Sequence, residues 1–375
     1  MSVVGNKDKI QRDALNAWFK AGCRGTIQLA TAGGKTRIGI LAISHFAKQA
    51  GYNFKALIVT PTVAIQDEWR KEFAKWGEDR VLIECVDIYC INTAREFEQE
   101  FYDIGVFDEI HNYVNGEINV KVFYNNKFDK ILGLSASIAH ELQPIIKKLA
   151  PICYKLGVYE ALDLGLISNF TVYSIPVELN KKEREEYDKL SKTITFVKQK
   201  TGNNSWGKIG KRKTLVYNTA SKIDMIKELS EKFGDKYGIF FSQTKDYADM
   251  VNKELGTICR PHHSGLSMKN RQTNLKRFAD KRSKVKRISS AKTLDEGVTL
   301  PRLEFGVIAA GSSKEKQLIQ RVGRTLRLDI QGKHAVIVYI YTANTVEEKW
   351  MKKAQLGFEV ININSIKDIK WGQRH

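Results

Sequence analysis

Cysteine and proline are scarce in this sequence, and no stretch of it is uniformly apolar. The five cysteines are odd in number and lack CxxC spacing, which argues against a disulfide framework and against a zinc site. There is no run of about 18 apolar residues and no apolar segment near the first residue, so we expect neither a membrane span nor secretion. With only six prolines and no biased tract, we expect an ordered, cytoplasmic protein.

Acidic residues are also in deficit. Asp and Glu number 42 against 61 Lys and Arg, so the formal net charge is +19. An excess of this size predicts a polyanionic partner, because each phosphate that a basic side chain neutralises releases condensed counterions. A basic balance also suits a protein that is merely soluble, so motifs have to decide whether the partner is nucleic acid.

Two series of alternating strand-like and helix-like segments follow each other along the 375 residues. This alternation is typical of βαβ units around a parallel sheet, so we predict an α/β fold with two domains, residues 1–165 and 166–375. The predicted strands are residues 25–29, 56–59, 81–83, 104–107 and 130–134, then 237–241, 257–260, 285–290, 305–309 and 335–341. Helices are expected over 35–49 and 180–200, and a loop over the glycine- and asparagine-rich segment 201–210.

A glycine-rich turn lies between the first predicted strand and the first predicted helix. Its sequence is Thr31-Ala32-Gly33-Gly34-Lys35-Thr36. A turn of this kind at a helix N-terminus presents free N–H groups and the positive end of the helix dipole to phosphate. Lys35 can neutralise terminal phosphates, and the Thr36 hydroxyl can ligate Mg²⁺. The general pattern has a further glycine where this chain has Leu29, so a plain glycine turn with a solvated lysine is the alternative.

Two adjacent carboxylates follow the predicted strand 104–107. Asp108 can hold the metal directly or through water, and Glu109 is a candidate base for the attacking water. Adjacent acids after a strand are also common as solvated turns. Their position downstream of the GKT turn, within one α/β unit, favours metal-dependent phosphate chemistry.

With His111 completing the segment Asp-Glu-Ile-His, the chain resembles a DExH-type helicase of superfamily 2 over residues 8–345. The resemblance implies two tandem RecA-like (P-loop) domains with parallel sheets flanked by helices. Gln11 stands where the family contacts adenine, and Ser135 and Ser137 stand in a segment that, with His111, couples hydrolysis to domain movement. The positions that match the family's nucleic-acid motifs in this domain are Thr60, Pro61, Thr62 and Thr93.

The second half of the chain supplies the most specific match. Residues 320–327, QRVGRTLR, agree with the family's QRxGRxxR motif at every fixed position. Arginines spaced three apart lie near one helical face, and their planar guanidiniums suit phosphate. The resemblance implies that Arg324 and Arg327 stabilise charge on the γ-phosphate from the wall opposite Lys35. It also implies that Arg321 supports them and that Gln320 contacts the nucleotide or His111.

Other segments of the second half resemble the family more loosely. Gly297 would lie close to the nucleotide, whereas Thr299 stands where many members have an aspartate that contacts ribose. That departure puts sugar recognition in doubt. The residues that match nucleic-acid contacts here are His263, Ser264, Gly265, Lys292 and Thr293.

These observations predict an ATP- and Mg²⁺-dependent DNA helicase or translocase that unwinds or branch-migrates forked DNA in replication, recombination or repair. The segments look most like the branch that includes XPB-like and phage UvsW-like helicases, and the compact size suits a viral or phage source. We expect a monomer that grips single-stranded or branched DNA mainly through its phosphates. The alternatives are an RNA helicase, a duplex DNA translocase that does not unwind, and a nucleic-acid-binding protein whose ATPase has decayed.

Three surface features fit more than one role. The basic runs 208–213 and 276–287 could widen the grip on phosphate or form an ordinary solvated face. Trp206, in the predicted loop 201–210, could stack on a base, although packing on its own domain is the favoured expectation.

Overall fold

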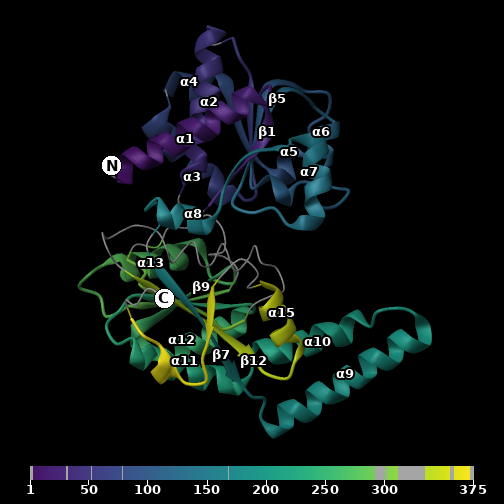
Figure 1. The fold of residues 1–375 in the computed structure, drawn as a ribbon, viewed down its shortest axis with the longest axis vertical. Coiled ribbons are helices and arrows are strands. Elements are labelled where there is room, and N and C mark those ends of the chain that lie inside the picture. Colours follow the sequence, from purple (N-terminus) through teal and green to yellow (C-terminus); the bar gives the residue numbers. More distant parts are fainter. Residues whose placement is uncertain are drawn as a thin grey trace. The chain divides into compact units, whose positions relative to one another are not determined.

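The computed structural model describes residues 3–30, 33–51, 53–77, 79–167, 169–291, 300, 302–310, 334–354 and 359–371. The chain folds into two compact units, unit 1 (Met1–Ile167) and unit 2 (Ser168–His375) (Figure 1). Each unit contains one sheet with helices packed on it.

Unit 1 is built on a six-stranded, wholly parallel sheet in the order β3-β2-β4-β5-β1-β6. Parallel strands covered on both faces need continuous apolar runs, and β2 is buried at all five of its positions. The strands are β1 (Arg24–Leu29), β2 (Ala56–Thr60), β3 (Val86–Cys90), β4 (Phe101–Asp108), β5 (Lys127–Ser135) and β6 (Ile152–Leu156).

Helices cover both faces of this sheet (Figure 1). On one face, α3 points Trp69 and Phe73, four residues apart and both fully buried, into the protein. On the other face, Ala94, Val122 and Ile146 join a single apolar cluster. The helices are α1 (Val3–Lys20), α2 (Lys35–Gln49), α3 (Val63–Trp76), α4 (Asp79–Cys85), α5 (Ile91–Ala94), α6 (Lys121–Tyr124), α7 (Gln143–Leu149) and α8 (Val158–Asp163).

Unit 2 has a seven-stranded parallel sheet in the order β13-β7-β12-β11-β8-β10-β9. Its longest pairing joins β12 to β7 and runs from Ala335 opposite Phe170 to Thr342 opposite Val177. The strands are β7 (Phe170–Val177), β8 (Gly238–Ser242), β9 (Cys259–His263), β10 (Arg287–Ala291), β11 (Phe305–Ile308), β12 (Ala335–Thr342) and β13 (Val360–Asn362).

Two helices of unit 2 form a long hairpin that leaves the sheet after β7 (Figure 1). Asn180 and Glu183 form a reciprocal capping box at the start of α9, and Gly202 ends that helix in the left-handed conformation at φ 68°. The helices of unit 2 include α9 (Lys181–Thr201), α10 (Trp206–Tyr217), α11 (Ala220–Lys232), α12 (Lys245–Leu255), α13 (Met268–Ala279) and α15 (Val346–Ala354). Among the helices described, none combines the length and apolar composition needed to cross a bilayer.

The predicted fold class, tandem α/β units with parallel sheets and flanking helices, is confirmed. The predicted strand 81–83 is wrong: these residues belong to α4, and the strand is β3, immediately downstream. A run of three apolar residues is too short to distinguish helical from extended periodicity. The prediction also omits β6, whose half-exposed side chains give a weak apolar pattern.

The predicted loop 201–210 is only partly correct, because α10 begins inside it at Trp206. Glycines disfavour an isolated helix, and packing against α9 overrides that preference here. The favoured expectation for Trp206 is also wrong, since its side chain is 73% exposed and does not pack into its own unit.

A buried ion pair lies between α11 and α15. The Lys222 Nζ is 2.8 and 2.7 Å from the two Glu347 carboxylate oxygens, and both side chains are completely buried. Lys222 also donates to the Val216 carbonyl at 2.8 Å, and Glu347 accepts from the Thr342 N–H at 2.9 Å. These bonds join the end of α10 to β12 and α15.

We predict that Glu347→Gln destabilises the protein strongly. Removing one partner leaves the Lys222 ammonium buried without a counter-charge, which costs about 3–5 kcal/mol. Chemical denaturation followed by circular dichroism measures the loss. The matched control is Glu254→Gln, which breaks the exposed pair with Lys227 and leaves the midpoint near that of the wild type. Equal midpoints for the two variants would contradict the prediction.

Candidate functional site

The glycine-rich turn joins β1 to α2 and depends on Gly34. This residue has φ 83°, a left-handed backbone conformation that is unfavourable for residues with a side chain. It directly precedes α2. A Cβ here would lie 2.1 Å from the Gln11 Nε2, which donates a 3.0 Å hydrogen bond to the Gly33 carbonyl. The first N–H groups of α2, including those of Lys35 and Thr36, have no partner within the helix and face the turn. Thr31 lies outside the described residues.

Leu29 is accommodated in the turn because Gly33 has no side chain. The Leu29 side chain is fully buried, and a Cβ at Gly33 would lie 2.4 Å from the Leu29 Cγ. The departure from the general pattern at Leu29 is therefore compatible with a formed turn.

Gln11, on α1, is 1% exposed and has a fixed amide orientation. Its Nε2 donates to the Gly33 carbonyl, and its Oε1 accepts from the Arg37 Nη1 at 2.9 Å. Arg37 in turn pairs with Asp8 and lies 4.1 Å from the Trp76 ring centroid. Gln11 thus ties α1 to the turn, and one amide hydrogen stays free of these two bonds.

Lys35 and Glu109 form a largely buried ion pair at the carboxyl edge of the sheet. The Lys35 Nζ is 3.8 Å from the Glu109 Oε1, and the two side chains are 13% and 15% exposed. Lys35 also donates to the Leu29 carbonyl at 3.4 Å. The turn after β1 and the end of β4 are therefore brought together, as the sequence predicted.

Asp108 is a buried carboxylate at the end of β4. The Trp69 indole N–H donates to its Oδ2 at 2.9 Å, and the Tyr113 hydroxyl donates to its backbone carbonyl at 2.5 Å. Burial, followed by the neighbouring Glu109 charge, raises the pKa of Asp108 to about 6, against the opposing effects of Trp69 and Lys35. The side chain is positioned by groups that sequence motifs do not include.

The strand turns sharply after Asp108. Glu109 has a left-handed backbone, φ 54° and ψ 49°, which is uncommon for a residue other than glycine. Its Oε2 is buried without a hydrogen-bond partner and lies 3.4 Å from the His111 Nδ1. A buried acceptor in this state indicates a place for a water or ligand group.

His111 connects this turn to the end of β5. Its Nδ1 is 2.6 Å from the Ser135 Oγ, which itself donates to the Ser137 carbonyl at 2.7 Å. Because the Ser135 proton is used in that bond, the hydroxyl accepts from His111, which places a proton on Nδ1. The structure thus brings together the three residues predicted to couple hydrolysis to movement.

The predicted nucleic-acid residues of unit 1 follow two adjacent strands. Thr60 ends β2 opposite Cys90 of β3, so residues 60–62 and Thr93 reach the same edge of the sheet. Thr60 is buried and donates to the Thr62 carbonyl at 3.0 Å, which shapes the turn. Thr62 and Thr93 are exposed, and Pro61 is partly exposed.

In unit 2, His263 ends β9 and is buried. Its Nε2 is 2.9 Å from the Asp249 carboxylate, and its Nδ1 accepts from the Gly265 N–H at 3.2 Å. The ring builds the turn that exposes Ser264 and Gly265. The predicted residues Lys292, Thr293, Gly297, Gln320, Arg321, Arg324 and Arg327 lie outside the described residues.

Two family models match the chain, one in each unit. Residues 6–90 match the model described as type III restriction enzyme, res subunit, and residues 221–329 match the helicase conserved C-terminal domain. A protein of Sulfurisphaera tokodaii named DNA 3'-5' translocase XPB2 is 25% identical over 393 residues, covering 92% of this chain and 85% of that protein. These matches support a superfamily 2 helicase.

Other similar proteins have names or structure titles that mention RNA in some cases and DNA in others. The Drosophila melanogaster protein named ATP-dependent RNA helicase DDX47 is 22% identical, covering 89% of this chain and 64% of that protein. The solved structure of S. cerevisiae Dbp5 bound to RNA and ADP BeF3 shares the fold at TM-score 0.65 and 17% identity, over 95% of this chain and 89% of that one. The DNA-bound restriction-modification enzyme LlaBIII has TM-score 0.62 at 13% identity, over 96% of this chain and 31% of that one.

Helicase domains are nucleic-acid-dependent ATPases, and helicases of this kind bind ATP with Mg²⁺. The residues of unit 1 fit such a ligand. The start of α2 and Lys35 supply positive groups for phosphate, whereas Asp108 and the Thr36 hydroxyl supply oxygen ligands of the kind Mg²⁺ prefers. The unpartnered Glu109 oxygen adds an acceptor beside them.

Sequence reasoning missed Trp69 as part of this helicase site. Its indole packs over Gly39, where a Cβ would lie 2.7 Å from the Trp69 Cη2, and holds Asp108 by a hydrogen bond. Only the helical spacing of Trp69 is visible in the sequence, and this spacing indicates a core residue.

We predict that Trp69→Phe raises the Mg²⁺ concentration needed for half-maximal ATP hydrolysis about tenfold, because groups that orient a metal ligand change metal affinity by about 10–100-fold. A Mg²⁺ titration of the helicase at saturating ATP measures the shift. Trp76→Phe is the matched control, since its indole N–H donates to Glu72 at 3.0 Å and not to a proposed metal ligand. Superimposable titrations for both variants and the wild type would refute the role given to Trp69.

We also predict that Asp108→Asn stabilises the metal-free helicase at neutral pH. The folded-state pKa of about 6 lies above the ordinary value of 3.8, so stability falls as pH rises from roughly 4 to 6 and stays low above that range. Removing the charge should therefore raise the free energy of unfolding by about 1–3 kcal/mol at pH 7.5. Thermal unfolding in EDTA should show a smaller gain at pH 5, and an equal or larger gain there would be inconsistent with this account.

Proposed function

We propose that this protein is an ATP-dependent DNA helicase or translocase that acts on forked or branched DNA in replication, recombination or repair. The observation that carries the proposal is the cluster at the edge of the sheet in unit 1, where Lys35 meets Glu109 at 3.8 Å beside the buried Asp108. The net charge of +19 supports a polyanionic partner. The protein acts as a monomer in the cytoplasm.

In this proposal the residues of unit 1 divide the work of hydrolysis. The Lys35 ammonium binds the terminal phosphates together with the free N–H groups at the start of α2. Thr36 and Asp108 would hold Mg²⁺, which would neutralise charge on the phosphates. The Glu109 carboxylate orients the attacking water and takes up its proton through the oxygen that has no other hydrogen-bond partner.

The remaining roles are proposed from position in the motifs. Gln11 contacts the adenine, and His111 with Ser135 and Ser137 transmits the state of Glu109 to the end of β5. Arg324 and Arg327 stabilise charge on the γ-phosphate, supported by Arg321, while Gln320 and Gly297 contact the nucleotide. Thr31, Gly33 and Gly34 complete the phosphate turn.

The choice of DNA rests on the translocase relative, which matches at higher identity and over more of its own length than the RNA helicase relative. RNA is the second candidate, since solved structures of the same fold are bound to RNA. Pro61, Thr62, Thr93, Ser264, Gly265, Lys292 and Thr293 are proposed to contact the phosphate backbone. The buried Thr60 and His263 are proposed to shape the turns that present these contacts.

We predict that Lys35→Ala and Glu109→Gln each lower nucleic-acid-stimulated ATP hydrolysis at least 100-fold and largely spare nucleic-acid binding. One variant removes the phosphate-binding cation, and the other removes the base. Phosphate release and fluorescence anisotropy measure the two properties. Lys48→Ala, at the far end of α2, and Glu117→Gln, an exposed acid, are matched controls. A wild-type protein without ATPase activity on any polynucleotide would favour the binding-only alternative.

A substrate panel decides between the candidate nucleic acids. Single-stranded, forked, Holliday-type and blunt DNA and a forked RNA are compared for ATPase stimulation and strand separation. The proposal expects the strongest stimulation and separation on forked or Holliday-type DNA. Preference for RNA, or duplex translocation that displaces a third strand without unwinding, would replace it with the corresponding alternative.

A further inference from the structure

The hairpin of α9 and α10 carries only positive charges toward its tip, whereas the end that joins the sheet carries charges of both signs. Residues 178–188 contain five acidic and three basic side chains, whereas residues 189–213 contain eight basic side chains and no acidic one. We call residues 189–213 the arm. Seven of the basic residues are exposed lysines, and within the described part of the chain none of them forms an ion pair: Lys189, Lys192, Lys198, Lys200, Lys208, Lys211 and Lys213.

Two aromatic side chains stand in solvent near the tip of the arm. Phe196, on α9, is 61% exposed, and Trp206, the first residue of α10, is 73% exposed. The Lys200 Nζ lies 5.7 Å from the Phe196 ring centroid. These rings do not hold the hairpin together, because its buried contacts, at Tyr187 and Val216, lie at the base.

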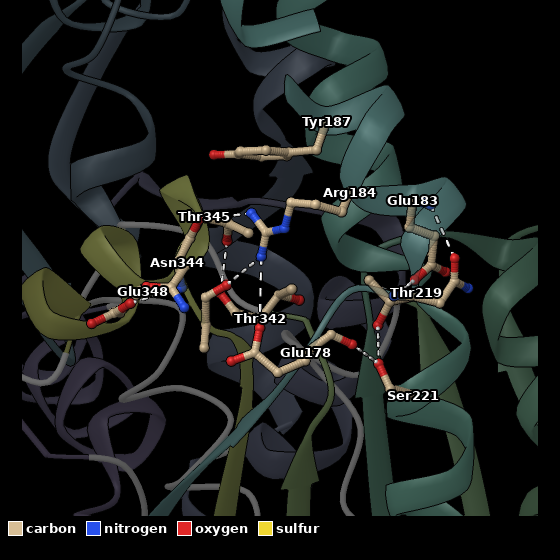
Figure 2. A network of polar contacts seen from close by, with 12 residues as sticks. Glu178, Glu183, Arg184, Tyr187, Thr219, Ser221, Thr342, Asn344, Thr345 and Glu348 are labelled. Carbon is tan, nitrogen blue, oxygen red and sulfur yellow. Dashed lines mark hydrogen bonds and ion pairs between the residues drawn. The ribbon is translucent and has the colours of Figure 1, made fainter. Parts of the chain in front are cut away.

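The base of the hairpin is fixed to the rest of unit 2 (Figure 2). Arg184 donates to the carbonyls of Asn344 and Ala343 at 3.1 and 3.3 Å, and the Tyr187 hydroxyl accepts from the Val346 N–H at 2.8 Å. At the start of α11, the Ala220 N–H donates to Glu183 of α9 at 3.0 Å. With the buried Lys222–Glu347 pair beside them, these bonds hold the arm in a defined direction on β12 and α15.

The charge and the rings of the arm select one kind of partner. Exposed lysines without counter-charges attract phosphates, and the arm's part of α9, residues 189–201, is about 20 Å long, enough to follow roughly half a turn of duplex backbone. A tryptophan ring can stack on a base only where a base face is free, which occurs in single strands and where a duplex ends. Phosphates beside a free base face coincide at the junction between duplex and single-stranded nucleic acid.

We propose that the arm binds the junction of a DNA fork, with its lysines on the phosphates and Trp206 stacked on the base at the junction. The proposal rests on the proposed function for the identity of the nucleic acid. Because the base of the hairpin is anchored in unit 2, the contact follows the movement of that unit.

Charge reversal on the arm tests the phosphate contact. Lys198→Glu with Lys200→Glu in the full chain should weaken binding to forked DNA about tenfold, and should lower the slope of log affinity against log salt by about 1.8 for two lost contacts. The matched control is Lys181→Glu with Lys182→Glu, two exposed lysines at the base of the same helix. Equal losses in the two double variants would overturn the proposal, because they would show only a general effect of net charge.

Removal of the tip ring tests the stacking. Trp206→Ala should weaken binding to a fork about tenfold and should abolish the quenching of a 2-aminopurine placed at the junction. Tyr124→Ala, a 70% exposed aromatic in unit 1, is the control, and circular dichroism confirms folding. Wild-type affinity and quenching in Trp206→Ala would overturn the proposal. If the arm variants lose binding but no polynucleotide stimulates ATP hydrolysis by the wild type, the role of the arm in binding is supported. The proposed motor function is then refuted.

Discussion

The candidate site depends on charges held at the carboxyl edge of a parallel sheet. Every strand of unit 1 points the same way, so the turn after β1 and the end of β4 reach the same edge. There Lys35 and Glu109 offset each other's charge, while Asp108 is buried deeply enough that its pKa is raised to about 6. A buried carboxylate beside a second one is costly without a cation, and this cost favours binding of Mg²⁺ and release of Lys35 to phosphate.

The local parts of the site could be predicted from the sequence. The GGKT turn and the Asp-Glu-Ile-His segment each need only a strand beside them, and both are formed as expected. Two packing relations that shape the site could not be predicted. Trp69 reaches Asp108 across 39 positions, and the Leu29 side chain fits only because Gly33 is bare. The sequence alone shows neither relation.

In the fold, too, some elements could be predicted from the sequence and others could not. Strong apolar runs such as β2 and β12 were located from the sequence, whereas the half-exposed β6 and the short segment 81–83 were not. The start of α10 at Trp206 shows tertiary packing against α9 overriding a glycine-rich sequence. The same packing presents an exposed ring on an arm with only positive charges, which gives the second unit a means to contact nucleic acid beyond the motif residues.

The central claim is that an ATP·Mg²⁺ complex binds where Lys35, Thr36, Asp108 and Glu109 meet. The most direct test is a structure of the full chain with a non-hydrolysable ATP analogue and Mg²⁺. We predict that the Lys35 ammonium leaves Glu109 for the terminal phosphates and that Mg²⁺ is coordinated at about 2.1 Å by the Thr36 hydroxyl, with Asp108 as a direct or water-mediated ligand. An analogue bound elsewhere, with the Lys35–Glu109 pair intact, would contradict the account.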